Sequence, residues 1–270
     1  MGPERMGVER AGSAVRRGFR SAAAILAGMV SMAAAGGLLV ACGGSGPPPA
    51  PPSSQGIVQN RAVPDIGLID ANGQPTSLAA FRGKYVVMAP FLTLCQEECP
   101  LITGAFIAMQ RDVRAAGLGR DVVFVEITVD PGRDSPARLA AFSKRFGVDW
   151  PLLTGTADNL RSLWSFFGVA EQVVPEPRPP GIDWWTGQPL TYDVSHTDGY
   201  ILIDRQGHER FVDVNAPNLH GKLSKGLAGL LDGQGLQNLR RPPEPSFTLS
   251  DAMASLSWLV GRDIPSTAST

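Results

Sequence analysis

The stretch Tyr85-Val-Val-Met-Ala-Pro-Phe-Leu-Thr-Leu-Cys95-Gln-Glu-Glu-Cys99-Pro100 carries an apolar run that leads directly into two cysteines four positions apart. A run of this kind without helical periodicity predicts a strand that is buried on both faces. The apolar spacing that follows predicts a helix over residues 101–116, with Gly117 as its stop. The stretch therefore predicts a thiol pair at a strand-to-helix junction.

Strand and helix patterns alternate on both sides of this junction. Strands are predicted at 66–70, 122–129 and 152–153, and helices at 135–146, 157–167 and 222–231; a hairpin pairs 199–204 with 209–214. Alternation of this kind requires right-handed crossovers and a sheet that is covered on both faces. We expect an α/β thioredoxin-like sandwich: a mixed central sheet with helices on both faces, a short N-terminal hairpin, and the closing hairpin as an antiparallel edge.

The first residues predict export rather than fold. Arg16, Arg17 and Arg20 precede an uncharged apolar stretch that ends at Leu39-Val-Ala-Cys42. This tetrapeptide resembles a bacterial lipobox, so residues 1–41 are predicted as a lipoprotein leader and Cys42 as the lipidated residue. An uncleaved transmembrane anchor is the alternative, because the stretch is long enough to span a bilayer. Both place the domain in the bacterial cell envelope, on the outer face of the cytoplasmic membrane.

The remaining chain divides by composition. Residues 42–57 are rich in Gly, Ser and Pro and predict a flexible tether. The folded domain is predicted over 58–233, and residues 234–270 form a C-terminal extension with a short helix at 249–260. The Pro-rich stretch 173–191, which contains Trp184 and Trp185, is too long for an ordinary connection. It is interpreted either as a partner surface or as a loop packed by its own aromatic side chains.

Composition excludes some classes of protein. The 270 residues carry a net charge of −1 and no run of Lys or Arg, which argues against a nucleic-acid surface. With three cysteines, of which Cys42 is explained by the leader, the chain is not a disulfide scaffold. One thiol pair remains for the folded domain.

The pair Cys95 and Cys99 suits redox chemistry, metal binding or a bracing disulfide. If both lie on one helix, positions i and i+4 share a face, with side chains roughly 5–6 Å apart. Thiolates there are stabilised by the helix N-terminus and select Cu(I) or zinc over hard cations. Thioredoxin-type redox motifs have the shorter Cys-x-x-Cys spacing. The spacing therefore favours a metal without excluding a disulfide.

Three histidines are available as a further ligand. His196 lies directly before the strand 199–204, in a loop that faces the thiol junction in a thioredoxin-like sheet. His208, in a tight turn at the far end of that strand, and His220 are interpreted as ordinary surface or satisfied side chains. His196 is the predicted third ligand.

From about Val63 to Leu231 the chain resembles the Sco/SenC family of copper chaperones, thioredoxin-like proteins involved in assembling the dinuclear copper centre of cytochrome c oxidase. The matching stretches begin at Ser77 (Ser-Leu-Ala-Ala-Phe-Arg-Gly-Lys), Cys95 (Cys-Gln-Glu-Glu-Cys-Pro), Val129 (Val-Asp-Pro-Gly-Arg-Asp-Ser-Pro), Trp150 (Trp-Pro-Leu-Leu-Thr-Gly) and Ser195 (Ser-His, ahead of Tyr200-Ile-Leu-Ile-Asp).

The resemblance implies that Cys95, Cys99 and His196 bind copper, as Cu(I) or Cu(II), that the Cys95–Cys99 pair can form a disulfide, and that Asp130 supports the site. It implies as partner the copper-bearing subunit of cytochrome c oxidase or another copper protein, with the membrane reached through the lipid anchor. A thiol-disulfide oxidoreductase acting on client cysteines is the alternative. Many members have Pro after the first cysteine, whereas this chain has Gln96 followed by Glu97 and Glu98.

Overall fold

The computed structural model describes residue 51 and residues 56–267. The predicted leader, Cys42 and most of the predicted tether lie outside these residues. The strands are β1 (Ile57–Ala62), β2 (Leu68–Asp70), β3 (Pro75–Thr76), β4 (Tyr85–Phe91), β5 (Val122–Thr128), β6 (Leu152–Thr154), β7 (Glu171–Val174), β8 (Asp193–His196), β9 (Tyr200–Ile203), β10 (His208–Asp213), β11 (Ala216–Asn218) and β12 (Ser246–Thr248). The α-helices are α1 (Cys99–Ala115), α2 (Pro136–Phe146), α3 (Ala157–Phe167), α4 (Lys225–Ala228), α5 (Gly233–Arg240) and α6 (Leu249–Val260), with a 3-10 helix at Leu78–Phe81.

One mixed sheet forms the centre of the molecule, with the strand order β1-β10-β9-β4-β5-β6-β2-β3. β4 pairs in parallel with β5 along its whole length, from Tyr85 opposite Val122 to Phe91 opposite Thr128, and β5 pairs in parallel with β6. On its other side β4 is antiparallel to β9. Because β4 has a strand on each side and layers above and below, its apolar sequence is almost completely buried.

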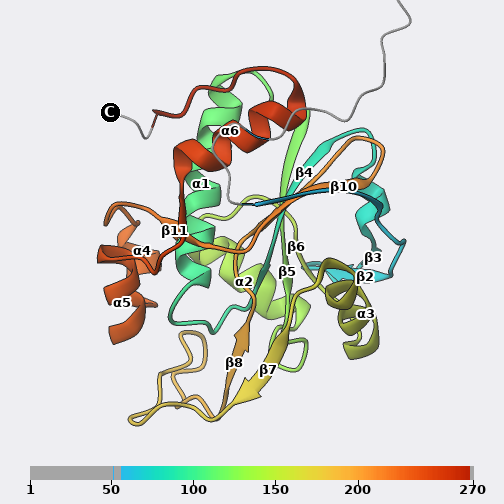
Figure 1. Cartoon of the computed structure of the whole chain (residues 1–270). Helices are drawn as coiled ribbons and strands as arrows, with labels where there is room; N and C mark the ends of the chain where they lie inside the picture. The colour runs from blue at the N-terminus through green and yellow to red at the C-terminus, as the bar shows by residue number, and fades with distance from the viewer. Residues whose placement is uncertain (1–50, 52–55, 268–270) are drawn as a thin grey trace, which may run out of the picture. The chain divides into compact units, whose positions relative to one another are not determined.

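Helices cover both faces of this sheet, and α1 and α2 lie on the face opposite α3 (Figure 1). On the first face, Phe106 of α1 packs edge-on against Phe124 of β5, and Phe142 of α2 packs against Phe91 of β4. On the other, Trp164 of α3 donates to the carbonyl of Thr128. The thioredoxin-like fold predicted from the sequence is confirmed, and so is the N-terminal hairpin, which is formed by β2 and β3.

Local signals also placed several helix ends correctly. Ser135 caps α2 by accepting from the amide of Arg138, with Pro136 as the first helical residue. Gly147 ends this helix in the left-handed conformation, which costs a residue without a Cβ atom little.

Three predicted elements are corrected. The β9–β10 hairpin is not an edge, because β1 pairs with β10 from Ile57 onward and covers it. The helix predicted over 101–116 begins two residues earlier, at Cys99. The helix predicted over 222–231 is short: α4 spans only Lys225–Ala228, and the chain turns at Gly229 before α5 begins.

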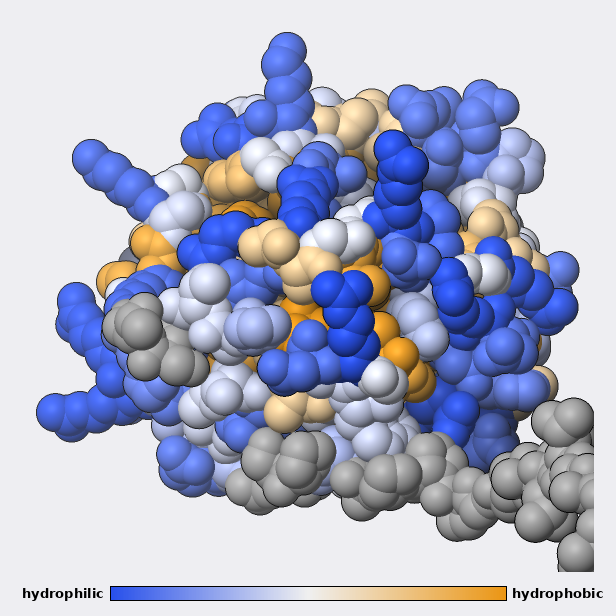
Figure 2. Space-filling model, turned by 90° about the horizontal axis from the view of Figure 1, so that it is seen from above, coloured by the Kyte–Doolittle hydropathy of each residue, from blue (hydrophilic) through white to orange (hydrophobic). Residues whose placement is uncertain are grey.

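The residues after Gly233 belong to the same compact unit as the sheet. β12 pairs in parallel with β11, and α6, predicted at 249–260, packs on α1. Met253 and Leu256 of α6 are fully buried. Seen from above, the face at the top of Figure 1 presents mainly hydrophilic side chains, with smaller patches of hydrophobic residues between them (Figure 2). The apolar side of α6 is therefore part of the core.

Candidate metal centre

The two cysteines lie on either side of a helix start. Cys95 sits in the turn after β4, and Cys99 is the first residue of α1. The amide of Cys99 donates to Cys95 Sγ over 3.3 Å, so the helix N-terminus supports this sulfur. Only Cys99 lies on the helix, so the turn rather than helical i, i+4 spacing brings the thiols together. Both are free thiols here, Cys95 partly exposed and Cys99 buried, and a disulfide between them stays a prediction.

A buried carboxylate fixes the turn that carries Cys95. Asp134 accepts from the amide and the hydroxyl of Thr93, and from the hydroxyl of Thr128 at the end of β5. Burial raises the pKa of Asp134 to about 6, although these donors oppose the rise. Through Asp134 the turn is tied to the neighbouring parallel strand.

His196 reaches the thiols from the facing hairpin, as predicted. It is the last residue of β8, and its Nε2 lies 3.3 Å from Cys99 Sγ. Its Nδ1 donates to the carbonyl of Thr197 over 2.9 Å, which turns Nε2 towards the sulfurs. Asp198 lies 3.8 Å from the same Nδ1. The contacts at Nδ1 therefore orient the imidazole ring, and Nε2 is directed at the thiols.

The thiols and the imidazole have opposed pKa shifts. A hydrogen bond from Cys99 lowers the pKa of Cys95 well below its ordinary value, against the effect of burial, and His196 lowers it further. Burial and the neighbouring Cys95 raise the pKa of Cys99. Burial lowers the pKa of His196, but the Cys95 sulfur and Asp198 outweigh it and raise the pKa to about 9. These shifts favour a thiolate at Cys95 and an imidazolium at His196 in the metal-free site.

Two cavities open beside Cys95. One, of about 250 Å³, lies between this residue and the Pro-rich loop, with Ile182 and Trp184 in its wall. The other, of about 390 Å³, is shared by Cys95 and His196 and has four carboxyl groups in its lining, those of Glu97, Glu98, Asp193 and Asp198. Clustered carboxylates in a cleft attract cations. Cys95 therefore lines two cavities.

The carboxyl groups between and beside the ligands are partly neutral near pH 7. Burial raises the pKa of both Glu97 and Glu98 to about 7, and the neighbouring negative charges add to this effect. Burial also raises the pKa of Asp198 to about 6, against the charge of His196. Proton uptake by these groups limits the repulsion that a fully charged cluster would impose on the thiolate.

The donor set fits a soft metal ion. Two thiol sulfurs and one imidazole are ligands that Cu(I) and zinc prefer, and hard cations do not. Within residues 51 and 56–267, no group of three or more His, Cys, Asp or Glu side chains could hold a metal ion as it stands. In the metal-free protein, Cys99 Sγ and His196 Nε2 contact each other. Metal binding therefore requires that both atoms lose their protons and move apart.

The other predicted residues lie farther from the thiols. Asp130 contacts Arg133 and accepts from the hydroxyl of Tyr192, the residue directly before β8. Its contacts lead to the ligands only indirectly, through Tyr192 on the side of β8 and through Thr128 and Asp134 on the side of the thiol turn. His208 lies at the start of β10, and His220 follows β11; neither joins the site.

The Pro-rich loop packs against the thiol turn. It is closed by the antiparallel pair β7–β8. Trp184 donates to the carbonyl of Thr93 over 2.7 Å and packs edge-on against Phe142, whereas Trp185 stacks on Trp184 and stays 46 % exposed. Both interpretations of the loop therefore retain support: its aromatics pack it in place, and one of them, Trp185, is left on the surface.

The C-terminal segment also contacts the thiol turn, which the sequence did not indicate. The amide of Asp232 donates to the carbonyl of Gln96 over 2.9 Å, and Asn238 of α5 donates to Glu98 over 2.6 Å. Gly235 packs directly on this backbone: a Cβ atom there would lie 2.3 Å from the carbonyl oxygen of Gln96. Figure 1 shows α5 beside the N-terminal end of α1.

Three residues of the site were therefore missed: Asp134, Asp198 and Asn238. Asp198 follows His196 by two positions, and this proximity in sequence was a usable signal. Asp134 and Asn238 lie 41 and 140 positions from the residues that they hold, so no local pattern reveals them.

Among the described residues no helix is both long and apolar enough to cross a membrane.

The known proteins that resemble this chain carry Sco or copper-binding names. A protein of Stutzerimonas stutzeri whose name presents it as a candidate copper-binding protein is 26% identical over 65% of this chain and 80% of its own length. The mitochondrial SCO2 homolog of Mus musculus is 34% identical, over 36% of this chain and 38% of its own. Among solved structures, Bradyrhizobium japonicum ScoI with copper bound has a TM-score of 0.47 at 22% identity and covers 67% of this chain and 99% of its own.

The sequence model of the SCO1/SenC family matches residues 55–220, more than half of the chain. This range includes β4, the thiol turn, α1 and the β7–β8 hairpin that supplies His196. The chain belongs to the SCO1/SenC family.

Proposed function

We propose that the protein is a copper chaperone of the cell envelope that binds copper through Cys95, Cys99 and His196 and passes it to a client. The observation that carries the proposal is the approach of His196 Nε2 to Cys99 Sγ, 3.3 Å, beside the partly exposed Cys95. Two thiolates and an imidazole suit Cu(I). Family membership and the copper-binding name of the Stutzerimonas relative agree with this donor set.

The client proposed is the copper-bearing subunit of cytochrome c oxidase. With three protein ligands the ion keeps an open side, and Cys95 lies at the two cavities through which a client's ligands can approach. Ligands are then traded one at a time, and the ion is not released to water. The leader and Cys42 support a lipid-anchored position on the outer face of the cytoplasmic membrane, where such a client exposes its copper site.

The test is Cu(I) titration of the reduced protein, with His196→Ala and Cys99→Ser beside the wild type and His208→Ala as the matched control. We expect one equivalent of tightly held Cu(I) in the wild type and in the control. Both site variants should bind more than about 100-fold more weakly, since even the loss of an outer partner of a ligand costs 10–100-fold. Retention of full affinity in His196→Ala would contradict a three-ligand site.

A thiol-disulfide oxidoreductase is the second candidate, and one observation favours it. The pKa of Cys95 is lowered whereas that of the buried Cys99 is raised, as expected for an attacking and a resolving thiol. In that reaction Cys95 and Cys99 are oxidised to a disulfide while a client disulfide is reduced to two thiols. Client reduction that is lost in Cys95→Ser and Cys99→Ser but retained in His196→Ala would favour this function over the chaperone.

A further inference from the structure

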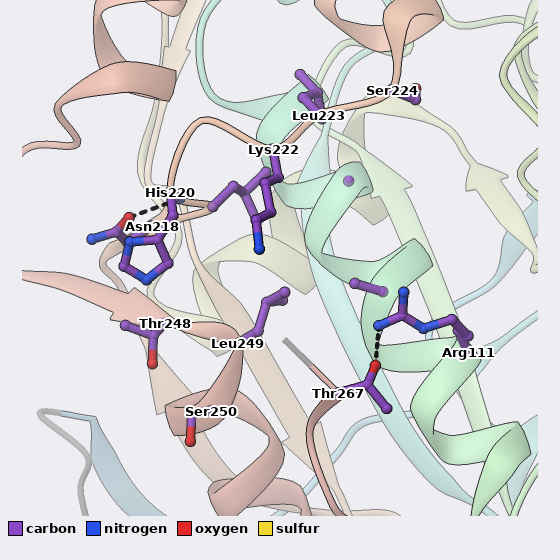
Figure 3. Close-up of a pocket in the computed structure, with 13 residues that line it drawn as sticks. Arg111, Asn218, His220, Lys222, Leu223, Ser224, Thr248, Leu249, Ser250 and Thr267 are labelled. Carbon is purple, nitrogen blue, oxygen red and sulfur yellow. Dashed lines mark hydrogen bonds between the residues drawn. The ribbon is translucent and has the colours of Figure 1, made fainter. Parts of the chain in front are cut away.

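A further cavity, of about 440 Å³, lies away from the thiols, between the outer side of α1 and the C-terminal segment. Its walls come from three places: α1, the loop that follows β11, and the first turn of α6 (Figure 3). Its size falls in the range of small-molecule sites. The lining residues are Gly104, Ala108, Arg111, Asn218, Leu219, His220, Lys222, Leu223, Ser224, Thr248, Leu249, Ser250 and Thr267.

The ionisable side chains that line this cavity are all basic. Arg111, His220 and Lys222 face it from two sides, and no carboxyl group belongs to the lining. Figure 3 shows the Lys222 side chain extending into the space between His220 and Arg111. Lys222 and His220 form no ion pair within the described part of the chain. Arg111 is ion-paired with Asp112, which is not among the lining residues, and also donates to the hydroxyl of Thr267 (Figure 3).

The backbone at His220 is specifically arranged. His220 has a φ of 50°, the only positive value for a non-glycine residue within 51 and 56–267. The side chain of Asn218 accepts from its amide over 3.0 Å and holds this turn. Leu249 and Ser250 of α6 also line the cavity, at a helix start that is capped by Thr248 and the carboxylate of Asp251.

The remaining wall is apolar. Gly104 and Ala108 present small side chains on α1, and Leu219, Leu223 and Leu249 stand opposite them. Leu223 packs directly on the backbone of Gly104, because a Cβ atom added there would lie only 2.4 Å from Leu223 Cδ1, so the open apolar wall is formed by Ala108 and the leucines. One part of the cavity is thus suited to a negative group and the adjoining part to a hydrocarbon chain.

We propose that this cavity binds a small amphipathic anion, a carboxylate or phosphate monoester joined to a short apolar chain. The anion pairs with Lys222, beside Arg111 and the start of α6, and the chain lies against Ala108, Leu223 and Leu249. The site is separate from the thiol centre and does not depend on copper.

The test is titration of the full chain with hexanoate, hexyl phosphate, inorganic phosphate and hexylamine, whose chains are short enough to stay monomeric in water. Binding is followed calorimetrically and by NMR shifts of Gly104 and of the Leu223 methyl groups. We expect saturable binding of hexanoate or hexyl phosphate, and the stronger of the two identifies the head group. Inorganic phosphate and hexylamine should bind at least about tenfold more weakly, because each lacks one half of the recognised chemistry.

Two pairs of variants locate the ligand. Lys222→Gln should weaken binding about tenfold or more, whereas Lys225→Gln, which changes the charge equally three residues away and outside the cavity, should not. Ala108→Leu fills the apolar part and should abolish binding, whereas Ala115→Leu, on an exposed position of the same helix, should not. Copper binding and thermal unfolding of all four variants report whether the fold is intact.

No saturable binding of either amphiphile overturns the proposal. So does equal binding of hexylamine, since the basic groups would then have no role, or equal binding of inorganic phosphate, since the apolar wall would then have none. Binding that survives both Lys222→Gln and Ala108→Leu places the ligand elsewhere and overturns it as well.

Discussion

The segment that matches the family, residues 55–220, and the segment that follows it act on the thiol turn in different ways. The first supplies every proposed ligand and the charges that set their pKa values. The second supplies no ligand, yet α5 holds the backbone between the two cysteines through Asp232, Gly235 and Asn238. The chemistry of the site is therefore encoded in one segment, whereas part of its geometry depends on the other.

This comparison also gives Glu98 a structural role. Glu98 is buried and accepts a hydrogen bond from Asn238, so one of the two acidic residues between the thiols serves as the attachment point for α5. Glu97 and Glu98 both line the cavity shared by Cys95 and His196, and Glu98 is the one that is also bonded to α5.

The largest effect is expected where the C-terminal segment enters the core. Leu256 of α6 is fully buried, and Leu256→Ala should lower the free energy of unfolding by about 2–5 kcal/mol, because it leaves a cavity among packed side chains. Urea unfolding measures this. Val214→Ala, at a position that is 55 % exposed, is the control and should change stability little. If Leu256→Ala were as stable as the wild type, α6 would not contribute to the stability of the core.

The sequence was sufficient for most of this fold because its signals are local. The apolar run of β4, the Ser135 cap and the turn at Asn72-Gly73 each act within a few residues, and the structure has a strand, a helix start and a hairpin there. His196 was found because sheet topology and metal chemistry pointed to the same loop. Family resemblance added the order of the motifs.

What the sequence did not provide depends on contacts between distant residues. Whether Cys95 lies on the helix is decided by the turn that Asp134 and Trp184 hold in place, and these residues are 39 and 89 positions away in the numbering from Cys95. Likewise, the partnership of Glu98 with Asn238 follows from how the segment after β11 returns to the sheet. No periodicity or motif encodes such a pair.

A second effect should appear on the thiol turn itself. Gly235→Ala places a Cβ atom 2.3 Å from the carbonyl oxygen of Gln96, so the turn or α5 must shift. We expect a loss of about 1–3 kcal/mol in stability, as in other overpacked sites, and weaker Cu(I) binding. Stability is read from urea unfolding and affinity from competition with a Cu(I) chelator.

Gly233→Ala is the matched control on the same helix, because nothing lies within 4 Å of the added Cβ atom. It should be neutral or stabilising by about 0.5–1 kcal/mol, the ordinary preference for Ala over Gly in a helix. If both variants bind copper like the wild type, α5 does not position the turn.

A smaller, pH-dependent effect is expected for Asn238→Ala. The folded-state pKa of Glu98, about 7, is above its ordinary value of 4.5, so ionisation of Glu98 costs stability as pH rises through this range. Asn238 counters that cost by donating to the carboxylate. Its removal raises the pKa of Glu98 further and should cost about 1–3 kcal/mol at pH 8 and less at pH 5.

Urea unfolding at the two pH values measures this difference. Gln237→Ala, at the exposed neighbouring position, should show no such trend. The double variant Glu98→Gln, Asn238→Ala should lose the pH dependence, because the ionising group is gone. If Asn238→Ala were as stable as the wild type at pH 8, Asn238 would not act through Glu98.

The smallest effect on stability, and the clearest on chemistry, is expected for His196→Ala in the metal-free protein. The pKa of Cys95 is lowered first by the Cys99 hydrogen bond and then by His196, so removing the imidazolium raises it. Alkylation of Cys95 by iodoacetamide, followed by mass spectrometry across pH 5–9, should therefore begin at a higher pH than in the wild type. Cys99 should stay unreactive in both proteins, because it is buried and its pKa is raised. His208→Ala, at the far end of β9, should keep the wild-type profile, and an unchanged profile in His196→Ala would assign the reactivity of Cys95 to the helix start alone.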